Sequence, residues 1–196
     1  MDANDQQLIR RHVEKYIQLK DEEFSLFASL LQPRMVKAKQ PVLQQGMVCQ
    51  QSIFVLKGIV RGYSSDKNGV EHVLSFAPEG WWIADMYSLI SGLPSTLNLE
   101  CMEDSSLLFL QKKEQEKLYD QVPKFERYFR ILLENSLVST QQRVLDNLSL
   151  SAEERFEKFC KNFPQLIQRV PQKHLASYIG VTPEFFSKMK NRFLKK

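Results

Sequence analysis

The sequence has no long apolar run and no segment that resembles a targeting signal. A membrane-spanning helix needs about 18 consecutive apolar residues, and no stretch of the chain reaches that length. The N-terminus is polar and lacks the apolar core of a secretory signal. We therefore expect a cytoplasmic protein that does not contact a membrane. Its hydrophobic residues, 43% of the chain, nevertheless suffice for a folded core.

Cysteine and histidine are scarce and widely separated. Cys49, Cys101 and Cys160 form no CxxC pair and no cluster with histidine. We expect buried, reduced thiols and no metal site, with a redox role for one cysteine as the alternative. A cupin-type enzyme needs several histidines and glutamates on neighbouring strands, whereas the β-type part of the chain offers only His72. An enzyme is accordingly not expected, and neither are catalytic residues or a cofactor.

Positive charge is concentrated at the C-terminal end of the chain. The formal net charge of the whole chain is +4. Residues 169–196 contain 7 basic residues and 1 acidic residue, a net charge of +6, so residues 1–168 carry −2. This distribution predicts contact with a polyanion such as DNA. The alternative is a solvated basic tail.

The first part of the chain is expected to be helical and the next part to be β-structure. Apolar residues recur at near-helical spacing in residues 5–31, which predicts two helices. Residues 34–111 consist of short β-type segments separated by turn residues, and Asn68-Gly69 is a strong hairpin turn. Such closely spaced strands predict an antiparallel barrel or jelly roll. We expect one short helix between the strands, at residues 82–90.

Residues 112–148 have a helical pattern, and the longer helix begins near Pro123. At about 25 residues this helix projects beyond a small barrel. Its apolar stripe predicts a dimer contact, because a long amphipathic helix between two small domains pairs readily with a second copy. The residues expected at this contact are Phe125, Phe129, Leu132, Leu133, Ser136 and Thr140. The alternative is that the stripe packs on the chain's own barrel.

The most specific pattern is a helix-turn-helix in residues 171–192. Pro171 opens the first helix, and the small Ala176 permits close approach of the second helix. Gly180 supplies the sharp turn. Thr182 is an N-cap, and Pro183 occupies the first position of the second helix. Each of these residues has a mechanical role in such a motif, which makes the pattern fairly specific.

The second helix, residues 183–192, is expected to lie in the major groove of DNA. Phe186 and Met189 should point inward. Glu184 can accept a hydrogen bond from cytosine, and Lys188 can donate one to guanine. The residues expected to contact bases or phosphates are Gln172, Lys173, Thr182, Glu184, Ser187, Lys188, Asn191 and Arg192. The alternative is a helical hairpin that packs without binding DNA.

Together these segments resemble the Crp/Fnr family of regulators over nearly the whole chain. The resemblance is carried by residues 55–58 and 59–63, the stretch 76–85, Gly180-Val181-Thr182, Glu184 and Ser187-Lys188. It implies an α+β fold in three parts: a cyclic-nucleotide-binding-like β-roll with flanking helices (1–122), a dimerisation helix (123–148) and a helix-turn-helix domain (149–196). It also implies a bacterial transcription regulator that binds double-stranded DNA as a homodimer. RNA polymerase is a further partner that the resemblance implies.

The sequence departs from the family pattern at the effector site. Cyclic-nucleotide binders of the family carry a Gly-Glu pair and later an Arg-Ser pair, whose arginine neutralises the phosphate. Here the pairs read Ala84-Asp85 and Ser95-Thr96, so no strong cation meets the phosphate at that position. Cyclic AMP is therefore not the expected effector. If the pocket holds a ligand, Trp82, Asp85, Ser95 and Thr96 are the residues expected to line it.

The alternatives are a regulator that responds to cyclic AMP and a nucleotide-sensing or scaffold protein that does not bind DNA. The DNA-binding end also departs from the family, which usually has arginines where this chain has Pro183 and Lys188. A different base preference follows. The sequence ends at Lys196 without the β-hairpin wing that often follows the recognition helix, and Lys195 and Lys196 would replace some of its phosphate contacts.

Overall fold

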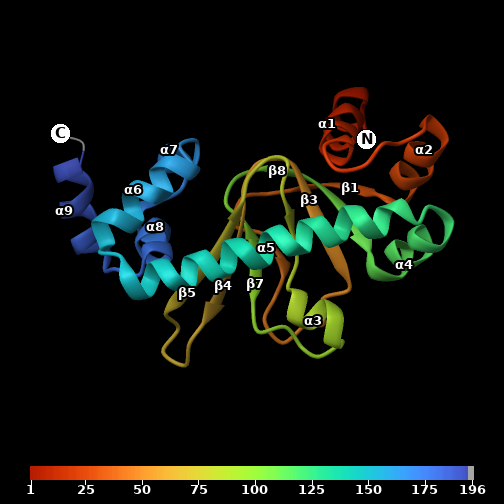
Figure 1. Ribbon diagram of the computed structural model, residues 1–196. Coiled ribbons are helices and arrows are strands. Elements are labelled where there is room, and N and C mark those ends of the chain that lie inside the picture. The colour runs from red at the N-terminus through yellow and green to blue at the C-terminus, as the bar shows by residue number, and fades with distance from the viewer. Residues whose placement is uncertain (194–196) are drawn as a thin grey trace. The chain divides into compact units, whose positions relative to one another are not determined.

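The structure is a computed structural model, and it describes residues 1–193 (Figure 1). The chain forms two compact units. The first contains Met1–Gly62 and Phe76–Asn135, and the second contains Tyr63–Ser75 and the chain from Ser136 onward. Three elements have residues in both units: β4 (Val60–Ser65), β5 (Glu71–Ala77) and α5 (Lys124–Ser149). The hairpin between β4 and β5 therefore groups with the C-terminal helices. The expected three-part division at residues 122 and 148 stays a prediction.

The strands form two four-stranded sheets, with the orders β1-β8-β3-β6 and β2-β7-β4-β5. The remaining strands are β1 (Gln32–Val36), β2 (Pro41–Leu43), β3 (Gln51–Lys57), β6 (Trp82–Ile83), β7 (Asn98–Cys101) and β8 (Ser105–Gln111). In the first sheet β3 pairs antiparallel with β8, with Ile53 opposite Phe109. The antiparallel β-roll that the sequence predicted is confirmed, and Gly69 has the positive φ expected of the hairpin turn.

Strand β3 is buried on both of its faces. Ile53 and Val55 belong to one core cluster together with residues of β7 and β8. Phe54 and Leu56 belong to a second cluster, formed with helices α1 (Ala3–Glu14), α2 (Asp21–Leu30) and α4 (Lys112–Gln121) and with the start of α5. Successive side chains of a strand point to opposite faces, so a strand between two cores is apolar throughout. This explains the continuous apolar run in the sequence of β3.

The prediction of a helix at residues 82–90 is wrong in its first part. Trp82 and Ile83 form strand β6, and the helix α3 (Met86–Ser91) begins only after Asp85. The Asp85 carboxylate accepts hydrogen bonds from the backbone N–H groups of Tyr87 and Ser88, at 3.0 and 3.3 Å. This N-cap fixes the start of the helix. Gly92 ends it in the left-handed conformation.

The C-terminal helices are α6 (Ala152–Asn162), α7 (Leu166–Arg169), α8 (Gln172–Ile179) and α9 (Pro183–Phe193). Ser151 and Glu154 form a capping box at the start of α6, because each side chain bonds the other residue's backbone N–H. The three cysteines are free, with Cys49 and Cys101 buried and Cys160 half-buried. None of the described helices is both long and apolar enough to cross a membrane.

Candidate nucleic-acid interface and effector site

The turn of the helix-turn-helix has the geometry that the sequence predicted. Helix α8 ends at Ile179, and Gly180 adopts the left-handed conformation with φ of 83°. Its N–H donates to the carbonyl oxygen of Ala176 at 2.9 Å. Thr182 Oγ1 accepts a hydrogen bond from the N–H of Phe185 at 3.2 Å, and α9 begins at Pro183. Local backbone chemistry therefore determines the angle at which α9 leaves α8.

The inner face of α9 is locked into the core of the second unit. Phe186 and Met189 are buried, as predicted, and so are Leu175 and Ala176 on α8. The Phe186 ring packs edge-on against Phe156 of α6, with ring centroids 5.1 Å apart. Because α9 is buried against α6 and α8, the three helices form one packed body.

All eight residues that the sequence predicted to contact DNA are exposed. Glu184, Ser187, Lys188 and Asn191 follow one another at spacings of three, one and three residues along α9. Residues at such spacings lie on one face of a helix. The structure therefore presents a continuous polar face opposite the buried one. Lys195 and Lys196 lie outside the described residues.

Two of the four residues predicted to surround an effector, Asp85 and Ser95, bond each other. Asp85 and Ser95 are each 2% exposed, and Ser95 Oγ donates a hydrogen bond to Asp85 Oδ2 at 2.5 Å. The Asp85 carboxylate also caps α3, so both polar groups are satisfied within the chain. Thr96 is exposed. The Asp85–Ser95 pair engages both side chains within the chain, and the role of these residues at an effector site stays a prediction.

Trp82 belongs to an aromatic cluster of the first unit. Its ring packs against Phe54 and Phe129, with centroid distances of 5.3 and 5.5 Å. Its indole Nε1 donates to Tyr128 Oη at 2.7 Å. Within the described residues, neither of two cavities found in the chain is lined by Trp82 or by the other predicted effector residues. Trp82 therefore has structural contacts within the first unit, and its role at an effector site stays a prediction.

A cavity of about 240 Å³ lies in the first unit. Its apolar lining residues include Val42, Leu43, Ile53 and Leu99. Three glutamines also line it: Gln50, Gln51 and Gln111. The Gln111 side-chain amide donates to the Gln51 amide oxygen at 2.6 Å, so two of these polar groups are already paired.

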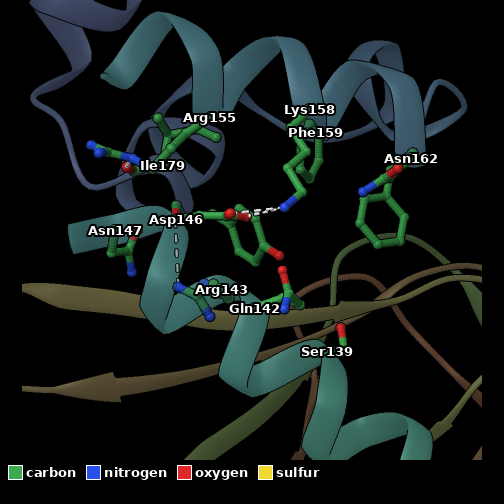
Figure 2. A pocket seen from close by; sticks show the side chains of 12 residues that line it. Ser139, Gln142, Arg143, Asp146, Asn147, Arg155, Lys158, Phe159, Asn162 and Ile179 are labelled. Atoms are coloured by element: carbon green, nitrogen blue, oxygen red, sulfur yellow. Dashed lines mark hydrogen bonds and ion pairs between the residues drawn. The ribbon is translucent and has the colours of Figure 1, made fainter. Parts of the chain in front are cut away.

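A smaller cavity, of about 110 Å³, lies in the second unit where α5, α6 and α8 meet (Figure 2). Lys158 on α6 pairs with Asp146 on α5, with Nζ 2.7 Å from Oδ2. Arg155 Nε donates to the carbonyl oxygen of Ile179 at 3.0 Å, which satisfies the end of α8. The charged groups of this cavity thus bond the chain itself and hold the three helices together.

Sequence reasoning missed a buried polar chain in the first unit. His12 Nδ1 lies 2.8 Å from Tyr128 Oη, the oxygen that also accepts from Trp82. With that acceptor position in use, the Tyr128 hydroxyl proton is directed at His12 Nδ1, which accepts it only while the imidazole is neutral. Burial lowers the pKa of His12 to about 4, and the charge of Lys15 adds to the effect. Burial also raises the pKa of Tyr128.

We expect acidification to destabilise the first unit through His12. The folded-state pKa of about 4 lies below the ordinary value of 6.5, so the unfolded chain binds a proton first as the pH falls. The stabilisation is present above pH 6.5 and is lost between about pH 6.5 and 4. Because the imidazole is partly exposed, the expected loss between pH 7 and 5 is only about 1 kcal/mol. Urea unfolding of the wild type and His12→Asn at both pH values measures it, and equal losses in the two proteins would contradict the assignment.

Comparison with known proteins identifies one domain of the chain and several similar folds. Residues 33–122 match the family model of the cyclic nucleotide-binding domain. The chain is 21% identical over 178 residues to the regulatory protein HlyX of Actinobacillus pleuropneumoniae, which covers 82% of this chain and 73% of HlyX. The fold resembles that of the regulator CLP of Xanthomonas campestris, described as c-di-GMP responsive, with a TM-score of 0.73 and 15% identity, over 90% of this chain and 92% of CLP.

A second similar structure is a transcriptional regulator assigned to the Crp/Fnr family from Eubacterium rectale. Its TM-score is 0.70 at 16% identity, over 90% of this chain and 84% of that one. The α+β architecture and the cyclic nucleotide-binding domain, which the sequence resemblance implied, are thereby confirmed. The chain therefore contains a cyclic nucleotide-binding domain and has the fold of the Crp/Fnr regulators.

Proposed function

We propose that the protein is a transcription regulator that binds double-stranded DNA as a homodimer, with α9 in the major groove. The observation that carries this proposal is the well-formed helix-turn-helix, whose second helix is buried at Phe186 and Met189 and polar on its opposite face. A recognition helix needs both features, because one face must hold its position while the other reads bases. The basic charge of residues 169–196 supports attraction to a polyanion.

The exposed residues divide into two groups by their chemistry. On α9, Glu184 accepts from cytosine N4, and Lys188 donates to guanine O6 or N7. Ser187 and Asn191 extend the same face. Residues placed to meet phosphates are Gln172, Lys173, Thr182 and Arg192. Base selection therefore rests on α9, and the ends of α8 and α9 contribute affinity that does not depend on sequence.

The dimer contact is assigned to the exposed apolar side chains of α5. Phe125 and Phe129 are buried in the core of their own chain, and Leu132 packs against it, so these three residues are engaged within the protomer. The exposed apolar side chains are those of Leu133, Leu137, Val138, Val144, Leu145 and Leu148. Leu133, Leu137, Val144 and Leu148 recur at spacings of four, seven and four residues, which is close to a coiled-coil seam. Ser136 and Thr140 border this stripe.

The roll is proposed to act without cyclic AMP. The chain lacks the arginine that would meet the phosphate, and Asp85 and Ser95 bond each other. The protein therefore binds its operator either constitutively or in response to a different effector. Contact of the DNA-bound dimer with RNA polymerase belongs to the same proposal.

Selection of genomic fragments with the purified protein, at fixed near-physiological salt and with or without cyclic AMP, tests the function. One palindromic motif recovered in both conditions is the expected result. A motif recovered only with cyclic AMP would overturn the assignment of a lost nucleotide site. If no fragment is retained under either condition, constitutive DNA binding is contradicted, which leaves a requirement for a different effector or the scaffold alternative.

Replacing Lys188 by Ala is expected to relax the preference for one base pair of the recovered motif. A lost base contact reduces discrimination there by about 1–3 kcal/mol, or roughly 5-fold to 150-fold. Lys173→Ala is the matched control, because it removes an exposed lysine placed to meet phosphate and should weaken all sequences alike. Binding of a set of single-base variants measures both effects. Equal losses over the whole set for Lys188→Ala would remove Lys188 from the base-reading residues.

A further inference from the structure

Strand β5 is bonded to the helix-turn-helix within the second unit. Ser177 of α8 is the centre of this contact, although its hydroxyl belongs to none of the DNA-facing residues. Ser177 Oγ accepts a hydrogen bond from the N–H of Val73 at 2.9 Å and donates one to the carbonyl oxygen of Glu71 at 2.8 Å. A residue of a neighbouring parallel strand would bond these same two backbone groups. One side-chain oxygen therefore takes the place of a strand partner.

This contact closes the free edge of a sheet. Strand β5 is the last strand in the order β2-β7-β4-β5, so the backbone groups on its outer side have no neighbouring strand. Edge strands need such groups covered. Here helix α8 covers them with a hydroxyl, and residues 71 and 73 are thereby attached to the first helix of the DNA-binding motif.

Arg143 of α5 makes a second set of bonds to the same strand. Its guanidinium donates to the carbonyl oxygens of Leu74 and of Val73, the latter at 3.0 Å. It also donates to the carbonyl oxygen of Tyr178 at 3.4 Å and lies 4.2 Å from the centre of that ring. Arg143 thus connects α5, β5 and α8 at one point. Its Nε is buried and has no hydrogen-bond partner among the described residues, so the charge is held here at a cost.

Two further sets of contacts involve the same hairpin. His174, on the same helix as Ser177, has Nδ1 3.8 Å from the Glu71 carboxylate. At the hairpin turn, Asp66 accepts hydrogen bonds from the N–H groups of Asn68 and Val70 at 2.8 and 3.0 Å. The turn and the strand that follows it are therefore both ordered by side-chain bonds. Because β5 is held at its turn and along its edge, it can restrain the position of the helix α8 that is bonded to it.

We infer that Ser177 and Arg143 are positioning residues that fix the direction of α9 and thereby the spacing of the two DNA half-sites that the dimer accepts. The inference rests on the proposed function. Helices α8 and α9 pack as one body, so a restraint on α8 is a restraint on α9. Without β5, that body is joined to α5 by the chain connection at residues 150 and 151 and by the Lys158–Asp146 ion pair. The bonds to β5 add an attachment at a second place and so remove rotational freedom that these two leave.

Half-site spacing is the property that such a restraint controls. Recognition helices of a two-fold dimer must lie about one DNA turn, or roughly 34 Å, apart. A freely rotating helix-turn-helix can bind operators with several half-site spacings at similar affinity. A restrained one binds one half-site spacing best and loses affinity when a base pair is inserted or removed between the half-sites. Neither Ser177 nor Arg143 needs to touch DNA for this effect.

The attachment itself is tested first by amide hydrogen exchange in the full chain without DNA. In Ser177→Ala the N–H of Val73 loses its acceptor, and we expect its exchange to become about 10-fold faster or more. Ser149→Ala is the matched control, because the Ser149 hydroxyl donates only within its own helix, to the carbonyl oxygen of Leu145. Unchanged exchange at Val73 in Ser177→Ala would overturn the inference.

Positioning is tested with operators whose half-sites are moved apart or together by one and two base pairs. The wild type should prefer one spacing by about 10-fold or more, and Ser177→Ala and Arg143→Lys should both reduce that preference to roughly 3-fold or less. Base preference within each half-site should stay unchanged, which a merely unfolded motif would not allow. A spacing preference equal to that of the wild type, despite faster exchange at Val73, overturns the positioning role alone. If the wild type retains no DNA, the proposed function falls together with this role.

Discussion

Replacing Leu137 by Glu is expected to convert the dimer into monomers and to weaken binding to the palindrome by about 100-fold or more. Leu137 is 59% exposed and lies in the middle of the apolar stripe on α5. In a dimer this side chain is buried, and an unpaired carboxylate there costs several kcal/mol. A dimer bound at one half-site binds the second half-site without a further encounter from solution. Monomers lose this advantage, because each half-site is then bound by a separate molecule. DNA affinity and assembly should therefore fall together.

The control adds the same charge on another face of the same helix. Asn135 is exposed and lies two residues before Leu137, about 200° around the helix axis. Asn135→Glu should leave both the dimer and DNA binding intact. Sedimentation at micromolar concentration and titration of the palindrome measure the two properties. A wild type that sediments as a monomer would contradict the dimer assignment, as would a dimeric Leu137→Glu.

Local chemistry made the helix-turn-helix predictable from the sequence. The left-handed Gly180, the capping hydroxyl of Thr182 and the fixed φ of Pro183 act within a few residues of one another. Such short-range constraints are independent of the rest of the fold. The buried positions Phe186 and Met189 follow from helical period once the start of α9 is known. Exposure of the polar face was predictable for the same reason.

The apolar stripe of α5 shows where such reasoning ends. Phe129 and Leu133 lie four residues apart and so satisfy the same period, yet Phe129 is buried in the core of its own chain and Leu133 is exposed. A neighbouring core covers only part of a long helix. Which part it covers depends on where the other elements lie, and the helical period of the sequence does not contain this information. The predicted dimer residues therefore mixed two groups, those engaged within the protomer and those left open.

Side-chain pairs between segments far apart in the sequence could not be predicted from the sequence either. His12 and Tyr128 are 116 residues apart, and Ser177 and Val73 are 104 apart. Asp85 and Ser95 are closer in sequence, but their mutual hydrogen bond depends on the path of α3 and the loop that follows it. Analogy with cyclic-nucleotide binders assigned both side chains to a ligand. In the structure they bond each other, and Asp85 also caps α3.

Replacing Gly58 by Ala is expected to cost roughly 3 kcal/mol or more of unfolding free energy. Gly58 joins β3 to β4 with φ of +101°, where a side chain is strained. An added Cβ would also lie 2.9 Å from Ser105 Cα, a backbone atom of β8 that cannot move without disturbing the sheet. Strain and overpacking each cost about 1–3 kcal/mol, and here both apply.

Gly46→Ala separates the two causes. Gly46 has a comparable φ of +89°, but a Cβ there would meet nothing within 4 Å. This variant should lose only the strain, about 1 kcal/mol. Urea unfolding at pH 7 measures both proteins against the wild type. Similar losses in the two variants would show that backbone strain alone determines the cost and that the approach of β8 to Gly58 contributes nothing. The larger loss in Gly58→Ala would show that glycine is required there by the packing of the roll as well as by the turn.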